Sequence, residues 1–200
     1  MEVIPLRAAH AVGAARLHLD NLPTSFRGRP GLALLTAYYT ALSNGAGASS
    51  FVAQSGGEII GFVCGIFDPL RFKIFLLKNQ ALRLAIWGTV AVLDRPALLF
   101  NLAPRVFQRG QDDPKSPPGY ELRPIVVSPA SRGQGVAGAL LSALLADASE
   151  RGFDRIHCYT EEDNLSANLF YQKNAFRKTG EFLRAGRLYS CYERGLMDNP

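Results

Sequence analysis

A glycine-rich turn between a strand pattern and a helix pattern constrains the fold of this chain more than any other feature. The turn reads Arg132-Gly133-Gln134-Gly135-Val136-Ala137; it follows the apolar strand pattern of residues 120–127 and opens the helical pattern of residues 136–151. The first amides of a helix lack backbone partners and carry partial positive charge. Glycines let a phosphate approach these amides closely, and an arginine adds charge. The run predicts either a phosphate-binding turn or only a tight connection.

A second pattern lies further along the chain. Asn164, Ala167 and Tyr171 are spaced three and four residues apart, and Phe176 opens the next expected strand. The order strand, Arg-x-x-Gly-x-Ala, helix, strand, Asn-x-x-Ala-x-x-x-Tyr, Phe resembles the GNAT superfamily of acyl-CoA-dependent N-acyltransferases. The resemblance is specific over residues 120–195 and general over residues 1–67, and residues 68–118 have no counterpart.

The resemblance implies one domain over residues 1–200 with an α/β (α+β) fold. A mixed, mostly antiparallel central sheet is flanked by helices, and a helical insertion occupies about residues 68–118. The co-substrate implied is acetyl-CoA, with no metal. In that family the strand before the turn pairs its backbone with the pantetheine arm, which here assigns Val126 and Val127. The other coenzyme contacts implied are Arg132, Gly133, Gln134, Gly135, Val136, Ala137, Gly138 and Asn164.

Two positions near the coenzyme have alternative interpretations. The amide of Asn164 can bond the pantetheine, or it can cap the helix that follows. Pro124 lies within the strand and cannot donate to a ladder. It therefore predicts either a bulge or splay that leaves a slot for the pantetheine, or an ordinary edge strand.

The resemblance also implies two catalytic side chains. Tyr171 matches the position of a tyrosine near the coenzyme sulfur, where a phenol can protonate a departing thiolate. Glu121 resembles the general base, or water-relay base, that an alkyl ammonium needs before it can attack a thioester. Strand alternation places Glu121, Arg123, Ile125 and Val127 on one face. A salt bridge between Glu121 and Arg123, or a solvated strand end, is the alternative, and His157 is a weaker candidate base.

The sequence departs from the family pattern just before Phe176, where the usual glycine is replaced by Ala175. Asn174 precedes it and can take the left-handed conformation at the helix end. We therefore expect the turn, and with it the placing of Tyr171, to be kept.

The remaining elements follow from periodicity and turn residues. Residues 68–110 combine apolar runs with basic residues and predict two or three helices, over residues 72–77, 81–93 and 97–107, followed by a mobile loop at 111–119. Elsewhere, strands are expected at 3–6, 51–54, 59–67, 120–127, 155–160, 176–182 and 188–193, and helices at 8–19, 32–42, 136–151 and 166–173.

The positive charge is concentrated in residues 71–109, which carry seven basic residues and one acidic residue, whereas the whole chain has a net charge of +5. This segment could face an anionic acceptor, coenzyme phosphates or a membrane surface. Nucleic acid is not expected, because no recognition motif accompanies the charge. Its helices either pack as a lid or homodimer contact, or lie on a membrane as an interfacial helix.

Composition is that of a globular protein, with 48% hydrophobic and 20% charged residues. The three cysteines, Cys64, Cys158 and Cys191, lie in apolar runs without metal-like spacing and are expected to be buried thiols in a reducing cytoplasm. The N-terminus shows no signal-peptide pattern.

The resemblance implies an N-acetyltransferase that moves an acetyl group from acetyl-CoA to a primary amine by direct attack. The acceptor is unspecified; the basic segment favours an anionic one, such as a nucleotide-linked amino sugar. The alternative is a non-catalytic acyl-CoA-binding or membrane-associated module with the same fold.

Overall fold

A single mixed sheet organises the molecule. The computed structural model describes residues 1–22, 27–94, 119–184 and 186–196, and these form a seven-stranded sheet in the order β1-β2-β3-β4-β5-β7-β6. Within it β4 and β5 run parallel and the other neighbouring strands are antiparallel, which confirms the predicted fold class. The strands are β1 (Glu2–Pro5), β2 (Ala48–Ser55), β3 (Glu58–Ile66), β4 (Tyr120–Val127), β5 (Arg155–Glu161), β6 (Arg177–Arg184) and β7 (Arg187–Gly195).

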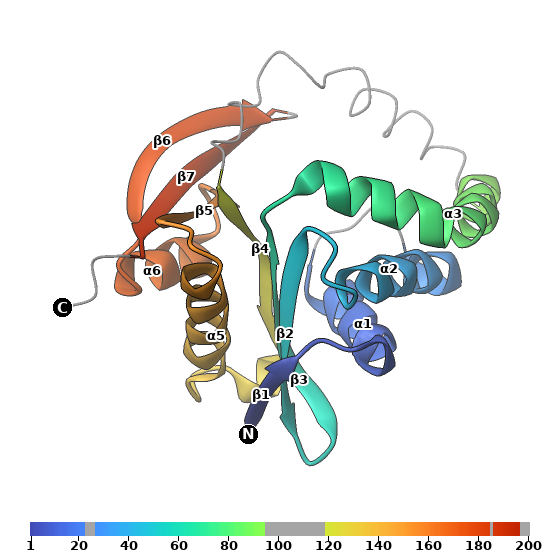
Figure 1. The fold of residues 1–200 in the computed structure, drawn as a ribbon, viewed down its shortest axis with the longest axis horizontal. Helices are drawn as coiled ribbons and strands as arrows, with labels where there is room; N and C mark the ends of the chain where they lie inside the picture. Colours follow the sequence, from blue (N-terminus) through green and yellow to red (C-terminus); the bar gives the residue numbers. More distant parts are fainter. Residues whose placement is uncertain (23–26, 95–118, 185, 197–200) are drawn as a thin grey trace.

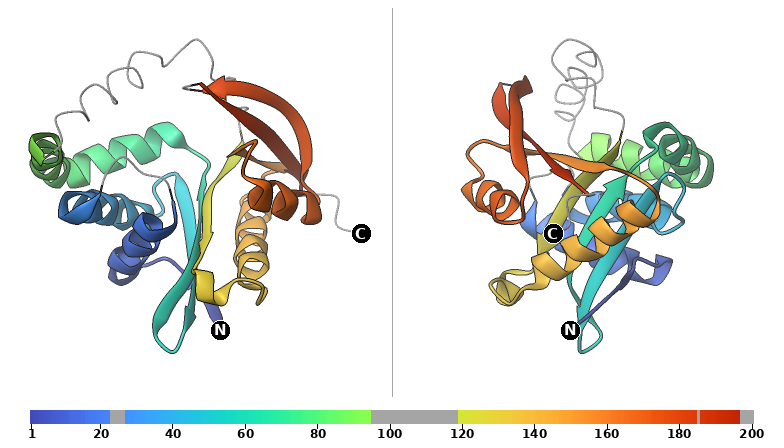
Figure 2. Two further views of the ribbon diagram at one scale, coloured as in Figure 1. Left: turned by 180° about the vertical axis from the view of Figure 1, so that it is seen from behind. Right: turned by 60° about the vertical axis from the view of Figure 1, so that its left-hand side comes forward.

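Helices cover both faces of the sheet (Figure 1). On one face α1 packs on β3 and β4, α2 packs on α1 and β2, and α3 packs on α2. On the other face α5 lies across β2, β3 and β4, and α6 lies beside the β6–β7 hairpin, as Figure 2 shows from two further sides. The helices are α1 (Ala11–Asn21), α2 (Gly28–Leu42), α3 (Pro69–Asp94), α5 (Val136–Glu150) and α6 (Leu165–Lys173), with short 3-10 turns η1 (Ala8–His10) and η2 (Pro129–Ser131).

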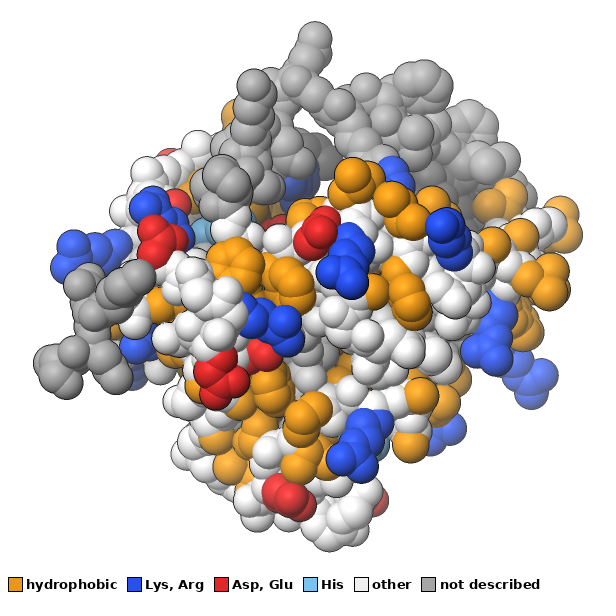
Figure 3. All heavy atoms as spheres, viewed as in Figure 1, with side chains coloured by type: hydrophobic (Ala, Val, Ile, Leu, Met, Phe, Trp, Pro, Cys, Tyr) orange, Lys and Arg blue, Asp and Glu red, His pale blue; other side chains and the backbone are white. Residues whose placement is uncertain are grey.

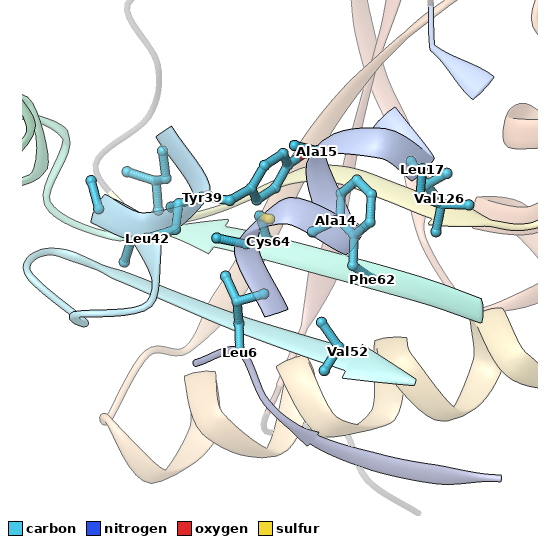
Figure 4. Close-up of a cluster of buried hydrophobic side chains, with 14 of the residues drawn as sticks. Leu6, Ala14, Ala15, Leu17, Tyr39, Leu42, Val52, Phe62, Cys64 and Val126 are labelled. Atoms are coloured by element: carbon cyan, nitrogen blue, oxygen red, sulfur yellow. The ribbon is translucent and has the colours of Figure 1, made fainter. Parts of the chain in front are cut away.

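Strand alternation divides the core into two clusters. Phe62, Cys64 and Ile66 of β3 point toward α1 and α2, whereas Val63 points toward α5. Figure 4 shows the first cluster, with Leu6 and Val52 beside Phe62 under the two N-terminal helices. Both faces of β3 are therefore buried, and this explains its nearly continuous apolar sequence.

Strand β4 has a bulge that changes which side chains face which cluster. Leu122 is opposite Gly65 and Ile125 is opposite Val63, so that Arg123 and Pro124 together oppose the single residue Cys64. After the extra residue the alternation is reversed. Leu122 and Ile125 consequently both pack on the α5 side, although their separation is odd.

The bulge corrects one prediction and supports another. The prediction that Ile125 and Val127 share a face with Glu121 is wrong, because both pack against the α5-side cluster, whereas the alternation from Tyr120 and Leu122 turns Glu121 away from it. The bulge interpretation of Pro124 is confirmed. Proline lacks the backbone N–H that a regular ladder needs, so the bulge in the β3–β4 ladder is a position that can accept it.

The segment after β3 differs from the expectation of separate helices. Residues 72–77 and 81–93 belong to one continuous helix, α3, because neither proline nor glycine interrupts them before Gly88. The helix predicted at 97–107 and residues 111–118 of the predicted loop lie outside the described residues. Among the described helices, none is both long enough and apolar enough to cross a membrane.

Candidate active site

The turn before α5 has the geometry that an anion site needs. Gly133 and Gly135 have φ angles of 74° and 79°, in the left-handed region that glycine favours. No side chain caps α5, and the first backbone bond recorded at this end runs from the amide of Ala139 to the carbonyl of Gly135 at 3.0 Å. The amides of Val136, Ala137 and Gly138 therefore point out of the helix end as free donors.

Access to this turn from solvent is open. A Cβ atom built on Gly133, Gly135 or Gly138 would meet no atom within 4 Å, so the space beside these three glycines is open. The side chain of Gln134 bonds back to the carbonyl of Ala130 at 3.0 Å, and Arg132 bonds to Asn21 of α1 at 3.2 Å. Both side chains lie beside the turn and leave its amides uncovered, which fits a pyrophosphate.

A slot opens next to the turn, where β4 and β5 part. In the parallel ladder between β4 and β5, Tyr120 pairs with Ile156 and Glu121 pairs with His157. The ladder ends after these two pairs. Val126 and Val127 pair with Phe62 and Gly61 of β3 on one side. On the β5 side that end of β4 has no partner among the described strands. Free backbone groups along an open edge are what the amides of a pantetheine arm need.

Tyr171 lies on the α5 and α6 side of this slot. Its ring packs among Phe170, Phe176 and Tyr192 with centroid separations of 5.3 to 5.6 Å, and the residue is 5% exposed. Its hydroxyl lies within hydrogen-bonding reach of the thiol of Cys158 on β5. Burial first, and then Cys158, hold the pKa of Tyr171 well above its ordinary value. The phenol therefore keeps its proton at neutral pH and can donate it.

Two asparagines hold α6 in place. The Oδ1 of Asn164 accepts from the amide of Ala167 at 3.2 Å, which is the capping role that the sequence left open for it. Asn168 was missed by the sequence reasoning, although it is 8% exposed. Its Nδ2 donates to the carbonyls of Glu161, Glu162 and Asn164, and its Oδ1 accepts from the hydroxyl of Tyr192 at 2.8 Å.

The turn after α6 survives the missing glycine in a different way from that predicted. Ala175 itself takes the left-handed conformation, with φ 61°, whereas Asn174 has φ −101°. The amide of Phe176 still bonds the carbonyl of Tyr171 at 3.0 Å. The strained residue is thus the alanine, at a cost of about 1 kcal/mol, and Tyr171 stays in place.

Glu121 lies on the opposite side of the sheet from Tyr171. It is 9% exposed, and its carboxylate accepts from Arg123 at 2.9 Å, so the salt bridge named as its alternative role is present. Beside it on β5 lies His157, which is 3% exposed. Burial, and the charge of Arg123, lower the pKa of His157 to about 4. The imidazole is therefore neutral at neutral pH.

The three cysteines and the possible metal ligands can be located in the structure. Cys64, Cys158 and Cys191 are all free, and the first two are buried. In the described ranges no three histidine, cysteine, aspartate or glutamate side chains come together as a metal site would require.

Comparison with known proteins assigns the fold and the family. An N-acetyltransferase from Staphylococcus aureus Mu50 has a TM-score of 0.63 and 15% identity, covering 98% of each chain. Arabidopsis thaliana NAA60, solved in complex with acetyl-CoA, has a TM-score of 0.61 and 14% identity over 97% of each chain. An aminoglycoside 6'-N-acetyltransferase complexed with coenzyme A has a TM-score of 0.61 and 13% identity, covering 100% of this chain and 99% of that one.

Identities this low show the fold alone, and no curated protein sequence matches the chain. The model of the acetyltransferase (GNAT) family, in contrast, matches residues 14–176, from the middle of α1 to the turn after α6. That match includes the turn at Arg132, the slot beside β4 and Tyr171. The chain therefore belongs to the acetyltransferase (GNAT) family, whose members transfer an acyl group from coenzyme A.

Proposed function

We propose that this acetyltransferase transfers the acetyl group of acetyl-CoA to a primary amine of a small acceptor, by direct attack in a ternary complex. The observation that carries the proposal is the alignment of the uncapped α5 turn with the open edge of β4. The turn offers amides for a pyrophosphate, and the edge offers backbone groups for the pantetheine.

Separate groups of this chain would handle the two protons of the reaction. As the amine nitrogen forms its bond to the acetyl carbon, the carbon–sulfur bond breaks and the coenzyme leaves as a thiolate. Tyr171 lies on the slot side of β5 and donates a proton to that thiolate. Glu121, which Arg123 orients at 2.9 Å, accepts the first proton that the ammonium must lose, directly or through a water. The nitrogen loses a second proton as the amide forms, and this proton restores the phenol of Tyr171 through solvent.

A screen of amine acceptors, with release of free coenzyme A as the readout, tests this proposal. Acetyl-CoA should be consumed faster with at least one amine than with water alone, and acetylated amine should appear in equal amount. Tight binding of coenzyme A without turnover on any amine would instead favour a non-catalytic acyl-CoA-binding module.

We also propose that the protein works in the cytoplasm and touches an anionic membrane surface through α3. The free thiols fit a reducing compartment. Arg71, Lys73, Lys78 and Arg83 are exposed along α3. Its exposed apolar side chains are Leu70, Ile74, Leu77, Leu82, Ile86, Val90 and Leu93. In the view of Figure 3, orange and blue side chains alternate over this helix. A symmetric dimer through α3 would bring its basic side chains together, which counts against the dimer alternative.

A further inference from the structure

A hollow of about 240 Å³ lies over the last three strands, on the face turned away from α6. Strand pairing brings its walls together: His157 is opposite Glu193, and Tyr159 is opposite Cys191. On β6, Gly180 is opposite Cys191 and contributes no side chain. The hollow is thus built into the sheet by its register.

The shape of the hollow depends on Gly180. A bulge in β6 between Lys178 and Gly180 places the glycine opposite Cys191. A Cβ atom on Gly180 would meet nothing within 4 Å, and the φ angle is not in the left-handed region. The backbone does not require glycine there, so the missing side chain only leaves space.

His157 gives the hollow an unsatisfied polar wall. The residue is 3% exposed, and neither ring nitrogen has a hydrogen-bond partner within the described part of the chain. An unpaired buried polar group costs about 1–3 kcal/mol. A ligand in the hollow with an N–H group would supply the missing partner, because a neutral imidazole offers one acceptor nitrogen.

Charge selects the kind of ligand. Two carboxylates flank His157 in the neighbouring strands, Glu121 on β4 and Glu193 on β7. Arg123 neutralises Glu121, but the structure records no hydrogen bond or ion pair for Glu193 among the described residues. Arg155 lies within its electrostatic reach, yet it is fully exposed and pairs with Asp154 at 3.4 Å. On β6, Arg177 is opposite Glu193, but no ion pair is recorded between the two side chains. The hollow therefore contains one carboxylate, Glu193, that has no ion-pair partner among the described residues.

Aromatic rings extend the same wall. The rings of His157 and Tyr159 line the hollow with centroids 5.6 Å apart. Phe182, whose centroid is 5.4 Å from that of Tyr159, lies outside the lining, and the guanidinium of Arg184 already lies over its ring at 5.3 Å. Aromatic faces attract organic cations. The aromatic wall therefore favours a cationic ligand, as Glu193 does.

The hollow and the donor slot lie on opposite faces of one strand. Cys158 points toward Tyr171, whereas its neighbours His157 and Tyr159 line the hollow. Both features lie where β5 parts from β4, just beyond the pair of Glu121 with His157. An amine in the hollow would thus approach a thioester in the slot from the side that carries Glu121.

We propose that this hollow binds the amine-bearing end of the acceptor, held by Glu193 and His157, and that the acceptor is a small cationic amine. This rests on the proposed function. It replaces the anionic acceptor expected from the sequence, since the described basic residues behind that expectation lie exposed along α3.

Three four-carbon amines that differ at the far end test the proposal: butane-diamine, aminobutanol and aminobutanoate. Turnover is followed by release of coenzyme A at constant ionic strength. Wild-type protein should prefer the diamine to aminobutanoate by about tenfold in kcat/KM. Glu193→Gln should raise the KM for the diamine about tenfold and narrow that preference, with coenzyme A affinity unchanged. Glu58→Gln, an exposed carboxylate on the β2–β3 hairpin, is the matched control and should change neither value.

The failures of the two proposals are distinguishable. If no amine is acetylated, the proposed function fails, and calorimetric binding of butane-diamine to the coenzyme A complex then decides the inference. Preference for aminobutanoate, or an unchanged diamine KM or Kd in Glu193→Gln, would overturn it. If that variant does not fold, Gly180→Val fills the hollow without a clash and should weaken every acceptor. Undiminished acetylation or binding in Gly180→Val would overturn the inference equally.

Discussion

At the scale of single residues, Tyr171 and His157 are both buried polar groups, and each one's surroundings fix its protonation state. Tyr171 keeps its proton because burial disfavours the phenolate. His157 stays neutral because burial disfavours the imidazolium. Burial therefore makes Tyr171 a proton donor beside one face of β5. It also leaves neutral His157 with a nitrogen that can accept a hydrogen bond on the opposite face.

The proton-donor role predicts the effect of Tyr171→Phe. The phenylalanine ring can keep the contacts with Phe170, Phe176 and Tyr192, whereas the hydroxyl is lost. Turnover should fall by roughly 100- to 10,000-fold, and the Kd for coenzyme A should stay within about threefold of the wild-type value. Steady-state kinetics on the best amine, with calorimetry for the coenzyme, give both numbers. Full turnover in the variant would remove Tyr171 from the mechanism.

The low pKa of His157 predicts a stability that depends on pH. Its folded-state pKa of about 4 lies below the ordinary 6.5, so the unfolded chain binds the proton more readily between these values. Folding free energy is therefore lost as pH falls through 6.5 toward 4. His157→Gln removes this titration and retains an amide. Between pH 7.5 and 4, denaturation midpoints should show wild type losing about 3 kcal/mol more than the variant. Equal losses would contradict the buried, neutral imidazole.

At the scale of elements, the uncapped start of α5 predicts opposite effects of an added negative charge. The charge should stabilise the helix and weaken coenzyme binding. Gly138 is the third residue of the helix, and a Cβ there would meet no atom within 4 Å. An aspartate at that position should favour the helix dipole by about 0.3–1 kcal/mol and raise helix propensity. It should also repel a pyrophosphate bound at the same amides.

Gly138→Asp should therefore weaken coenzyme A binding by about tenfold or more relative to Gly138→Asn, which has the same shape without the charge. The melting temperature of Gly138→Asp should be no lower than that of wild type. The difference in affinity should shrink in 1 M salt, where the screening length is about 3 Å. Equal affinity of the two variants would place the pyrophosphate elsewhere.

The elements also show how far the sequence could predict this structure. Residues 120–127 were predicted as a strand with the observed bounds, because β-branched residues and flanking turn residues mark it locally. The reversed faces of Ile125 and Val127 could not be predicted, since a bulge is defined by the partner strand. The hollow could not be predicted either, because the pairing of His157 with Glu193 joins strands distant in sequence.

Two differences between the prediction and the structure have causes in the nearby sequence. The helices expected at residues 72–77 and 81–93 form one continuous helix, α3, because no helix breaker lies between these two apolar runs. Ala175 takes the left-handed conformation that the sequence assigned to Asn174. Propensity favoured the asparagine, but the bond from Phe176 to the carbonyl of Tyr171 fixes the turn at the alanine.

At the scale of the whole molecule, the charges separate into two regions. Residues 71–109 carry seven basic residues and one acidic residue, and the basic residues among them that the structure describes lie exposed on α3. The hollow over β5 and β7 carries an unpaired carboxylate instead. A cationic acceptor is therefore drawn to the hollow and repelled by α3, which leaves α3 free for an anionic surface.

The last prediction tests that separation with a triple variant. Replacing Arg71, Lys73 and Lys78 with glutamine should abolish binding to vesicles that contain anionic phosphatidylserine, because each basic residue near such a surface contributes about 1 kcal/mol. Binding of wild type should also weaken as salt is raised from 0.1 M to 1 M. Activity in solution and coenzyme A affinity should be unchanged, since α3 packs on α2 and lines neither the turn nor the hollow. Sedimentation with vesicles measures the first quantity, and analytical ultracentrifugation without lipid is the control. A wild-type dimer that dissociates in the triple variant, with no vesicle binding, would assign α3 to self-association instead.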